Sequence, residues 1–176
     1  TPGIGSTFYF SIKVIPDPES NSSQFLHTER PQLIGKRVLV LDDNATNRRI
    51  LGLQLKKWGV LVRDTESPEK ALEWVGRGDP FDLAILDMHM PKYTGISLAE
   101  AIRSFPVGKE LPLILFSSMG QAEADARSDL FAAYLTKPLR PSLLLDTLLN
   151  IFSGKPFKAG EAKMAVSNED DSQPLG

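Results

Sequence analysis

Residues 36–153 alternate five times between short apolar runs and longer segments whose apolar residues recur at helical spacing. The apolar runs cover residues 38–41, 60–62, 83–86, 113–116 and 133–135, and the helical segments cover 45–58, 67–76, 96–104, 121–130 and 142–152. A short run without polar interruption is typical of a strand that is covered on both faces. Such regular alternation predicts a parallel α/β sheet with helices on both of its faces.

The composition excludes several classes of protein. The 176 residues include no cysteine, which rules out disulfides, cysteine zinc sites and thiol nucleophiles. Lysine and arginine total 20 against 22 aspartates and glutamates, and residues 36–154 hold 15 charges of each sign. This balance disfavours nucleic-acid binding through a basic surface. No apolar run approaches the roughly 20 residues of a membrane span, so we expect a cytoplasmic domain without direct membrane contact.

The segments that flank this region differ from it in composition. Residues 1–16 contain a strand-like alternation of apolar and polar side chains, and a lone strand requires a sheet supplied from elsewhere. Residues 17–35 are rich in proline, serine and asparagine, which is the composition of a linker. Residues 154–176 lack periodic apolar positions, so we predict a disordered tail.

Reactive side chains follow four of the expected strands directly. They are Asp42 and Asp43 after the first strand, Asp87 after the third, Ser117 after the fourth and Lys137 after the fifth. Ligands of parallel α/β sheets bind beyond the carboxyl ends of the strands, so we expect these side chains to meet at one edge. Three carboxylates without histidine or cysteine suit a hard cation such as Mg²⁺, which in turn favours a phosphoryl partner.

Asp87 is the candidate nucleophile of this group. It ends the most central strand, and we expect the following loop, with Pro91 and Gly95, to leave its carboxylate exposed. A carboxylate can attack phosphorus to form an aspartyl phosphate. Taken singly, each residue of the group is explained as a helix cap, a turn residue or a surface lysine, and only the joint pattern indicates a site. A cis peptide before Pro138 would direct Lys137 inward, although such bonds are trans by default.

With these motifs, residues 36–153 resemble the receiver domain of response regulators in two-component signalling. The matching segments are 38–44 with Asn47, 87–91 with Gly95, 117–118, and 134–139. The resemblance implies a flavodoxin-like (βα)5 three-layer sandwich with a parallel five-stranded sheet in the order 2-1-3-4-5. It also implies a phosphorelay function in which one new charge reshapes a protein-interaction face.

The resemblance further assigns roles to the site residues. Asp87 would accept a phosphoryl group from phosphohistidine on a kinase or phosphotransfer domain. Asp43 and Asp87 would bind Mg²⁺ directly and Asp42 through water, with the backbone carbonyl of His89 as a further ligand. Lys137 would pair first with the acceptor carboxylate and then with the phosphoryl group.

A second group of residues would transmit or time the signal. Ser117 would follow the phosphate inward, and Tyr134 would rotate with it as an aromatic switch. His89 and Met119 occupy the positions that tune phosphate lifetime, although a purely steric effect is the alternative for both residues. The output face would comprise the fourth helix, fifth strand and fifth helix, and dimerisation through this face would be possible. The stretch from Ser117 to Lys137 is slightly shorter than is usual in the family.

The amino-terminal segment 3–10 resembles the last hairpin of a histidine-kinase ATP-binding domain. This implies part of a hybrid histidine kinase, with a kinase remnant at 1–16, a linker at 17–35 and the receiver at 36–153. A glycine-rich turn before an unrelated strand is the alternative. The nucleotide-binding motifs of a kinase are absent, so we expect this fragment to catalyse at most its own phosphorylation and dephosphorylation.

Other functions fit parts of the pattern. A binding-only receiver, which regulates its kinase without phosphorylation, would normally lack a key residue, and none is missing. A phosphatase of the haloacid-dehalogenase type requires a second aspartate two residues after the nucleophile, where this sequence has His89. A DNA-binding regulator is disfavoured because the segment after Phe152 is too short and too polar for a helix-turn-helix domain.

Overall fold

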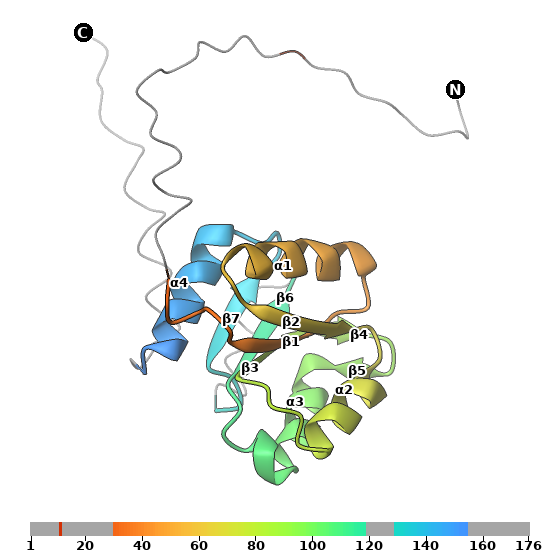
Figure 1. Ribbon diagram of the computed structural model, residues 1–176. Coiled ribbons are helices and arrows are strands. Elements are labelled where there is room, and N and C mark those ends of the chain that lie inside the picture. The colour runs from red at the N-terminus through yellow and green to blue at the C-terminus, as the bar shows by residue number, and fades with distance from the viewer. Residues whose placement is uncertain (1–10, 12–29, 119–128, 155–176) are drawn as a thin grey trace, which may run out of the picture.

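A computed structural model describes Ser11, residues 30–118 and residues 129–154 (Figure 1). The strand expected within residues 1–16, most of the linker, Met119, the greater part of the helix expected over 121–130 and the tail after Gly154 lie outside the described residues. The predictions made for these segments remain predictions.

Five parallel strands form the central sheet. They are β1 (Arg37–Leu41), β2 (Leu61–Thr65), β3 (Leu83–Asp87), β6 (Leu113–Ser117) and β7 (Ala133–Thr136). Two further strands, β4 (His89–Met90) and β5 (Tyr93–Thr94), form a separate antiparallel hairpin. The order in the sheet is β2-β1-β3-β6-β7, which confirms the predicted order 2-1-3-4-5 of the five sheet strands.

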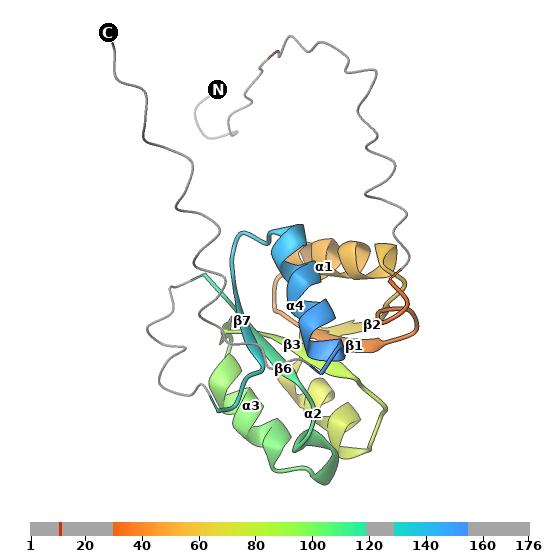
Figure 2. The ribbon, with the colours of Figure 1, turned by 90° about the vertical axis from the view of Figure 1, so that its left-hand side faces the viewer.

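Helices cover both faces of this sheet, as Figures 1 and 2 show from two directions. The helices α1 (Ala45–Lys57) and α4 (Pro141–Phe152) lie on one face, and α2 (Pro68–Gly76) and α3 (Gly95–Arg103) lie on the other. Alternate strand residues contribute to the two apolar layers. Leu39 and Leu41 of β1 pack with α2 and α3, whereas Val38 and Val40 pack with α1 and α4. The predicted three-layer α/β architecture is therefore confirmed.

The second strand is longer than the sequence predicted. We expected residues 60–62, whereas β2 continues to Thr65 and pairs with β1 along its whole length. Because β2 is an edge strand, the side chains of Arg63 and Asp64 remain exposed while their backbone joins the ladder. Apolar runs mark strands buried on both faces and underestimate strands at an edge.

Short elements between the main strands also escaped prediction. The β4–β5 hairpin follows β3 directly, and the 3₁₀ helix η1 (Pro106–Gly108) lies between α3 and β6. Elements of two or three residues contain too few positions to show a hydrophobic period. Among the described residues, no helix has the length and apolar character needed to cross a membrane.

Candidate metal centre

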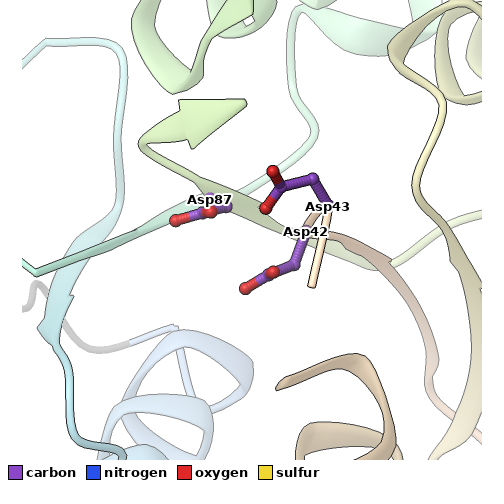
Figure 3. Close-up of side chains that lie close together, drawn as sticks. All are labelled: Asp42, Asp43 and Asp87. Carbon is purple, nitrogen blue, oxygen red and sulfur yellow. The ribbon is translucent and has the colours of Figure 1, made fainter. Parts of the chain in front are cut away.

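The carboxylates of Asp42, Asp43 and Asp87 meet at the carboxyl edge of the sheet (Figure 3). One oxygen atom from each carboxylate can be chosen so that all three lie within 4.8 Å of one another. Asp42 and Asp43 follow β1, and Asp87 is the last residue of the neighbouring strand β3. The parallel register of these two strands therefore brings together acids that are more than forty residues apart in the chain.

Asp42 is buried, with 1% of its surface exposed, and is fixed by polar contacts from Asn44 and from Asn47 of α1. Its Oδ1 accepts a hydrogen bond from the backbone N–H of Asn44 at 2.8 Å. The side-chain amide of Asn47 donates to Oδ2 at 3.0 Å and to Oδ1 at 3.3 Å. The side chain of Asn44 caps α1 by accepting from two backbone amides of the first turn, so neither aspartate is used as the helix cap.

Asp43 differs from its neighbour because its side chain is exposed. Within residues 30–118 and 129–154, its carboxylate makes no hydrogen bond or ion pair. As far as the described residues are concerned, both of its oxygens are thus available to an external ligand.

Lys137 reaches this cluster from the end of β7. Its Nζ lies 2.8 Å from Asp87 Oδ1 and 3.2 Å from Asp42 Oδ2, and 5.0 Å from the centre of the Phe116 ring. The backbone N–H of Lys137 donates to the carbonyl of Ser117 at 2.8 Å, which ties the end of β7 to the end of β6. The peptide bond between Lys137 and Pro138 is cis.

The environment of the site shifts the pKa values of both Asp87 and Lys137. Burial raises the pKa of Asp87, and the charge of Asp42 adds to this rise, while the hydrogen bond from Lys137 opposes it. Burial by itself lowers the pKa of Lys137, but its contacts with Asp87 and Asp42 outweigh burial and raise the pKa. Lys137 is therefore a stable cation that partly balances three carboxylates.

The expectation that the loop after β3 leaves Asp87 exposed is wrong. Only 3% of the residue is exposed, because it is still part of the central strand and Lys137 lies against its carboxylate. Asp43, which is exposed, is the member of the cluster that solvent reaches most freely.

The loop after Asp87 is held close to β3 by a glycine. The N–H of Gly95 donates to the carbonyl of Met88 at 2.9 Å, and a Cβ atom at this position would lie 2.8 Å from the carbonyl oxygen of Asp87. Only a residue without a side chain fits this approach. Within the hairpin, His89 pairs with Thr94 and its side chain is exposed.

The predicted switch residues lie on β6 and β7, the two strands on the side of the sheet opposite to β2. Ser117 is the last residue of β6 and is opposite Thr136 of β7. The ring of Tyr134 is partly buried on the α2–α3 side, with its centre 5.5 Å from that of Phe131. Met119 lies outside the described residues.

The donor set of the cluster fits a hard divalent cation. All its side-chain ligand atoms are carboxylate oxygens, and no histidine or cysteine side chain belongs to the group. Three carboxylates against the single ammonium group of Lys137 leave an excess of negative charge, which a cation would relieve. Oxygen donors of this kind are the ligands that Mg²⁺ prefers.

Sequence reasoning missed one residue that contacts this site, Arg48. Its guanidinium donates to the backbone carbonyls of both Asp42 and Asp43. The available signal was its place one turn into the helix that begins directly after the acidic pair.

Comparison with known proteins identifies the fold. The family model described as the response regulator receiver domain matches residues 38–149, more than half of the chain. The chain belongs to this family. The receiver domain is also similar to the crystal structure of the response regulator TrrA from Thermotoga maritima in complex with Mg²⁺–BeF, with a TM-score of 0.60 and 29% sequence identity. That alignment covers 66% of this chain and 98% of TrrA.

The chain also matches parts of much longer curated relatives. The 3′,5′-cyclic-nucleotide phosphodiesterase regA of Dictyostelium discoideum is 33% identical over 163 residues, which are 88% of this chain and 20% of that protein. Probable histidine kinase 6 of rice is 34% identical over 96 residues, 53% of this chain and 10% of that kinase. The chain thus spans a fifth or less of the length of these relatives.

Proposed function

We propose that Asp87 of this receiver domain accepts a phosphoryl group from a phosphohistidine donor. In this proposal Asp43 and Asp87 bind Mg²⁺ directly and Asp42 binds it through water. The backbone carbonyl of His89 is a further ligand. The observation that carries the proposal is the convergence of one buried strand-end carboxylate with two further carboxylates and a lysine ammonium group. The relative TrrA, solved with Mg²⁺ and BeF, supports this choice of ligand.

In the proposed reaction, Asp87 is the nucleophile. One of its carboxylate oxygens bonds to phosphorus while the phosphorus–nitrogen bond of the donor breaks. The electron pair of that bond passes to the imidazole nitrogen, which takes a proton from solvent. Mg²⁺, when bound, would supply positive charge to the phosphoryl oxygens. Lys137, whose Nζ already contacts Asp87, is placed to donate a hydrogen bond to one of the same oxygens.

The new charge would then bias the packing near β6 and β7. In this proposal the hydroxyl group of Ser117 donates a hydrogen bond to the phosphoryl group, and the ring of Tyr134 moves when Ser117 moves. His89 and Met119 affect the rate at which water hydrolyses the aspartyl phosphate. Ser117 and Lys137 are joined through backbone at the same sheet edge, which supports a link between site and switch. The proposed dimerisation face comprises residues 121–130, β7 and α4, and the first of these segments lies largely outside the described part of the chain.

We further propose that the phosphohistidine donor is a histidine kinase or phosphotransfer domain, either in the same parent chain as this receiver or in a separate relay partner. The similarity to a rice histidine kinase over 96 residues, and the resemblance of segment 3–10 to the end of a kinase ATP-binding domain, support this origin. A cytoplasmic location follows from the same proposal, because the donor of such a relay acts inside the cell.

Intact-mass spectrometry after incubation with Mg²⁺ and acetyl phosphate tests the proposal. Wild type and Asp87→Asn are compared, each with and without EDTA. We expect one added phosphoryl group in wild type with Mg²⁺ and none in the other three samples. Equal labelling of Asp87→Asn would overturn the assignment of the acceptor, and labelling in EDTA would overturn the dependence on Mg²⁺. A wild type that stays unlabelled, even by a phosphorylated kinase domain, would indicate a binding-only receiver.

A further inference from the structure

Arg48 connects the carboxyl ends of β1 and β2 beside the acidic site. Its Nη1 donates to the backbone carbonyl of Asp42 at 2.8 Å and to that of Asp43 at 3.1 Å. Its Nη2 donates to Glu66 Oε2 at 3.0 Å, and its Nε lies 3.4 Å from Asp64 Oδ2. The side chain is 13% exposed, so these four contacts satisfy a largely buried guanidinium.

The two carbonyls that Arg48 binds belong to the peptide units on either side of the Asp43 Cα atom. Fixing both peptide planes fixes the backbone dihedral angles of Asp43, and with them the direction of its Cα–Cβ bond. The carboxylate of Asp42 does not depend on these Arg48 contacts, since Asn47 and Lys137 bind it directly. The carboxylate of Asp43 has no such partner in the described part of the chain, so its aim depends on its backbone.

We propose that Arg48 is a positioning residue that aims Asp43 for cation binding. The inference rests on the proposed Mg²⁺ site and deepens it, because it names the residue that pre-organises the exposed metal ligand. Groups that orient metal ligands typically change metal affinity about 10- to 100-fold when they are removed.

The direction in which Mg²⁺ affinity changes when Arg48 is replaced distinguishes a positioning role from a purely electrostatic one. Arg48 is a cation near a cation site, so loss of its charge alone would strengthen Mg²⁺ binding. Asp64 and Glu66 contact the same guanidinium and offset its charge, which keeps this electrostatic contribution small. Loss of positioning would weaken Mg²⁺ binding instead.

The test measures Mg²⁺ affinity by isothermal titration calorimetry for wild type, Arg48→Met and Arg49→Met at fixed ionic strength. Arg49 is the matched control, because it is exposed on the same helix and makes no side-chain hydrogen bond or ion pair among the residues described. We expect Arg48→Met to bind Mg²⁺ at least about 10-fold more weakly than wild type. Arg49→Met should stay within about twofold, since exposed charges at this distance are screened. Phosphorylation of Arg48→Met by acetyl phosphate should need more Mg²⁺ yet approach the wild-type rate at saturation.

A separate urea unfolding curve for each variant shows whether that variant is folded under the conditions of the titration. If Arg48→Met does not fold, Arg48→Lys replaces it, since lysine keeps the charge but loses the separate Nε and Nη2 contacts that orient the donor. Unchanged or tighter Mg²⁺ binding by the folded Arg48 variant, with normal binding by wild type, would overturn this inference alone. Absence of Mg²⁺ binding by wild type would overturn the proposed function as well.

Discussion

The ammonium nitrogen of Lys137 lies 2.8 Å from the carboxylate of Asp87, although the two residues are 50 positions apart in the chain. Lys137 follows β7 and Asp87 ends β3, with β6 between the two strands. The contact therefore depends on the register of three parallel strands. It places one cation among three acids, so the cluster retains the negative charge that a divalent cation requires.

Replacement of Asp87 by asparagine should abolish phosphorylation and stabilise the fold. Burial raises the pKa of Asp87, so the ionised carboxylate opposes folding at neutral pH and this penalty disappears as pH falls through the folded pKa. We expect the free energy of unfolding at pH 7 to be higher for Asp87→Asn than for wild type. Urea unfolding of wild type and Asp87→Asn, without Mg²⁺, measures the difference at several pH values. A variant that is less stable than wild type at pH 7 would contradict this account.

Replacement of Lys137 by alanine should leave Mg²⁺ binding in place, but Mg²⁺ binding should no longer be coupled to the movement of Tyr134. The ammonium group contributes no metal ligand, but it joins the acceptor to the strand that carries Tyr134. Removal also leaves two buried carboxylates without their cation, which should lower stability by about 1–3 kcal/mol. NMR of the tyrosine ring resonances before and after phosphorylation reports the switch. The control is Lys109→Ala, an exposed lysine without a side-chain contact in the described regions. Wild-type shifts of Tyr134 in Lys137→Ala would rule out the proposed coupling.

Replacement of Gly95 by alanine should destabilise the domain by about 1–3 kcal/mol, as overpacking of a tight site does. A Cβ at this position would collide with the Asp87 carbonyl and with the side chain of Leu115. Gly52, in the middle of α1, is the matched control, because a Cβ there meets nothing within 4 Å. Gly52→Ala should be neutral or stabilise by up to about 1 kcal/mol through helix propensity. Equal effects of the two substitutions on urea unfolding would show that the close approach does not matter.

Asp79 should contribute stability that is lost in acid. The hydrogen bond from Arg77 and that from Arg63 lower the pKa of Asp79 from 3.8 to about 2. A lowered pKa stabilises the fold above the unfolded value, and this stabilisation disappears as pH falls from about 4 to about 2. The thermal midpoint of Asp79→Asn should lie below that of wild type at pH 6, with a smaller gap at pH 3. Asp146→Asn, at an exposed helix position without a side-chain contact in the described residues, is the control. If the difference in thermal midpoint between wild type and Asp79→Asn did not change with pH, the ion pairs of Asp79 would not be the source of this stability.

The sequence was most informative where strands are buried on both faces. The expected strand 83–86 differs from β3 by one residue, and 113–116 differs from β6 by one residue, because unbroken apolar runs identify such strands. The edge strand β2 was underestimated, since exposure lets polar residues such as Arg63 join the ladder. The β4–β5 hairpin was missed, because four paired residues do not establish a period.

The acidic site was predictable because it depends on strand ends, and strand ends follow from the apolar runs. The burial of Asp87 was not, since it results from Lys137 of a distant strand lying against its carboxylate. The full set of Arg48 contacts was only partly predictable: its position one turn into the helix places it near the acidic pair, but its contact with Glu66 joins residues 18 positions apart. Side-chain contacts between elements require the three-dimensional arrangement, which residue spacing alone does not contain.

The most direct test of the central claim locates the phosphoryl group within the chain. The protein is phosphorylated with acetyl phosphate and Mg²⁺, treated with borohydride, which reduces an aspartyl phosphate to homoserine, and analysed by peptide mass spectrometry. We predict homoserine at position 87 alone, dependent on Mg²⁺, with Asp42 and Asp43 unmodified. Homoserine at position 42 or 43, or phosphate on another type of side chain with Asp87 intact, would contradict the account.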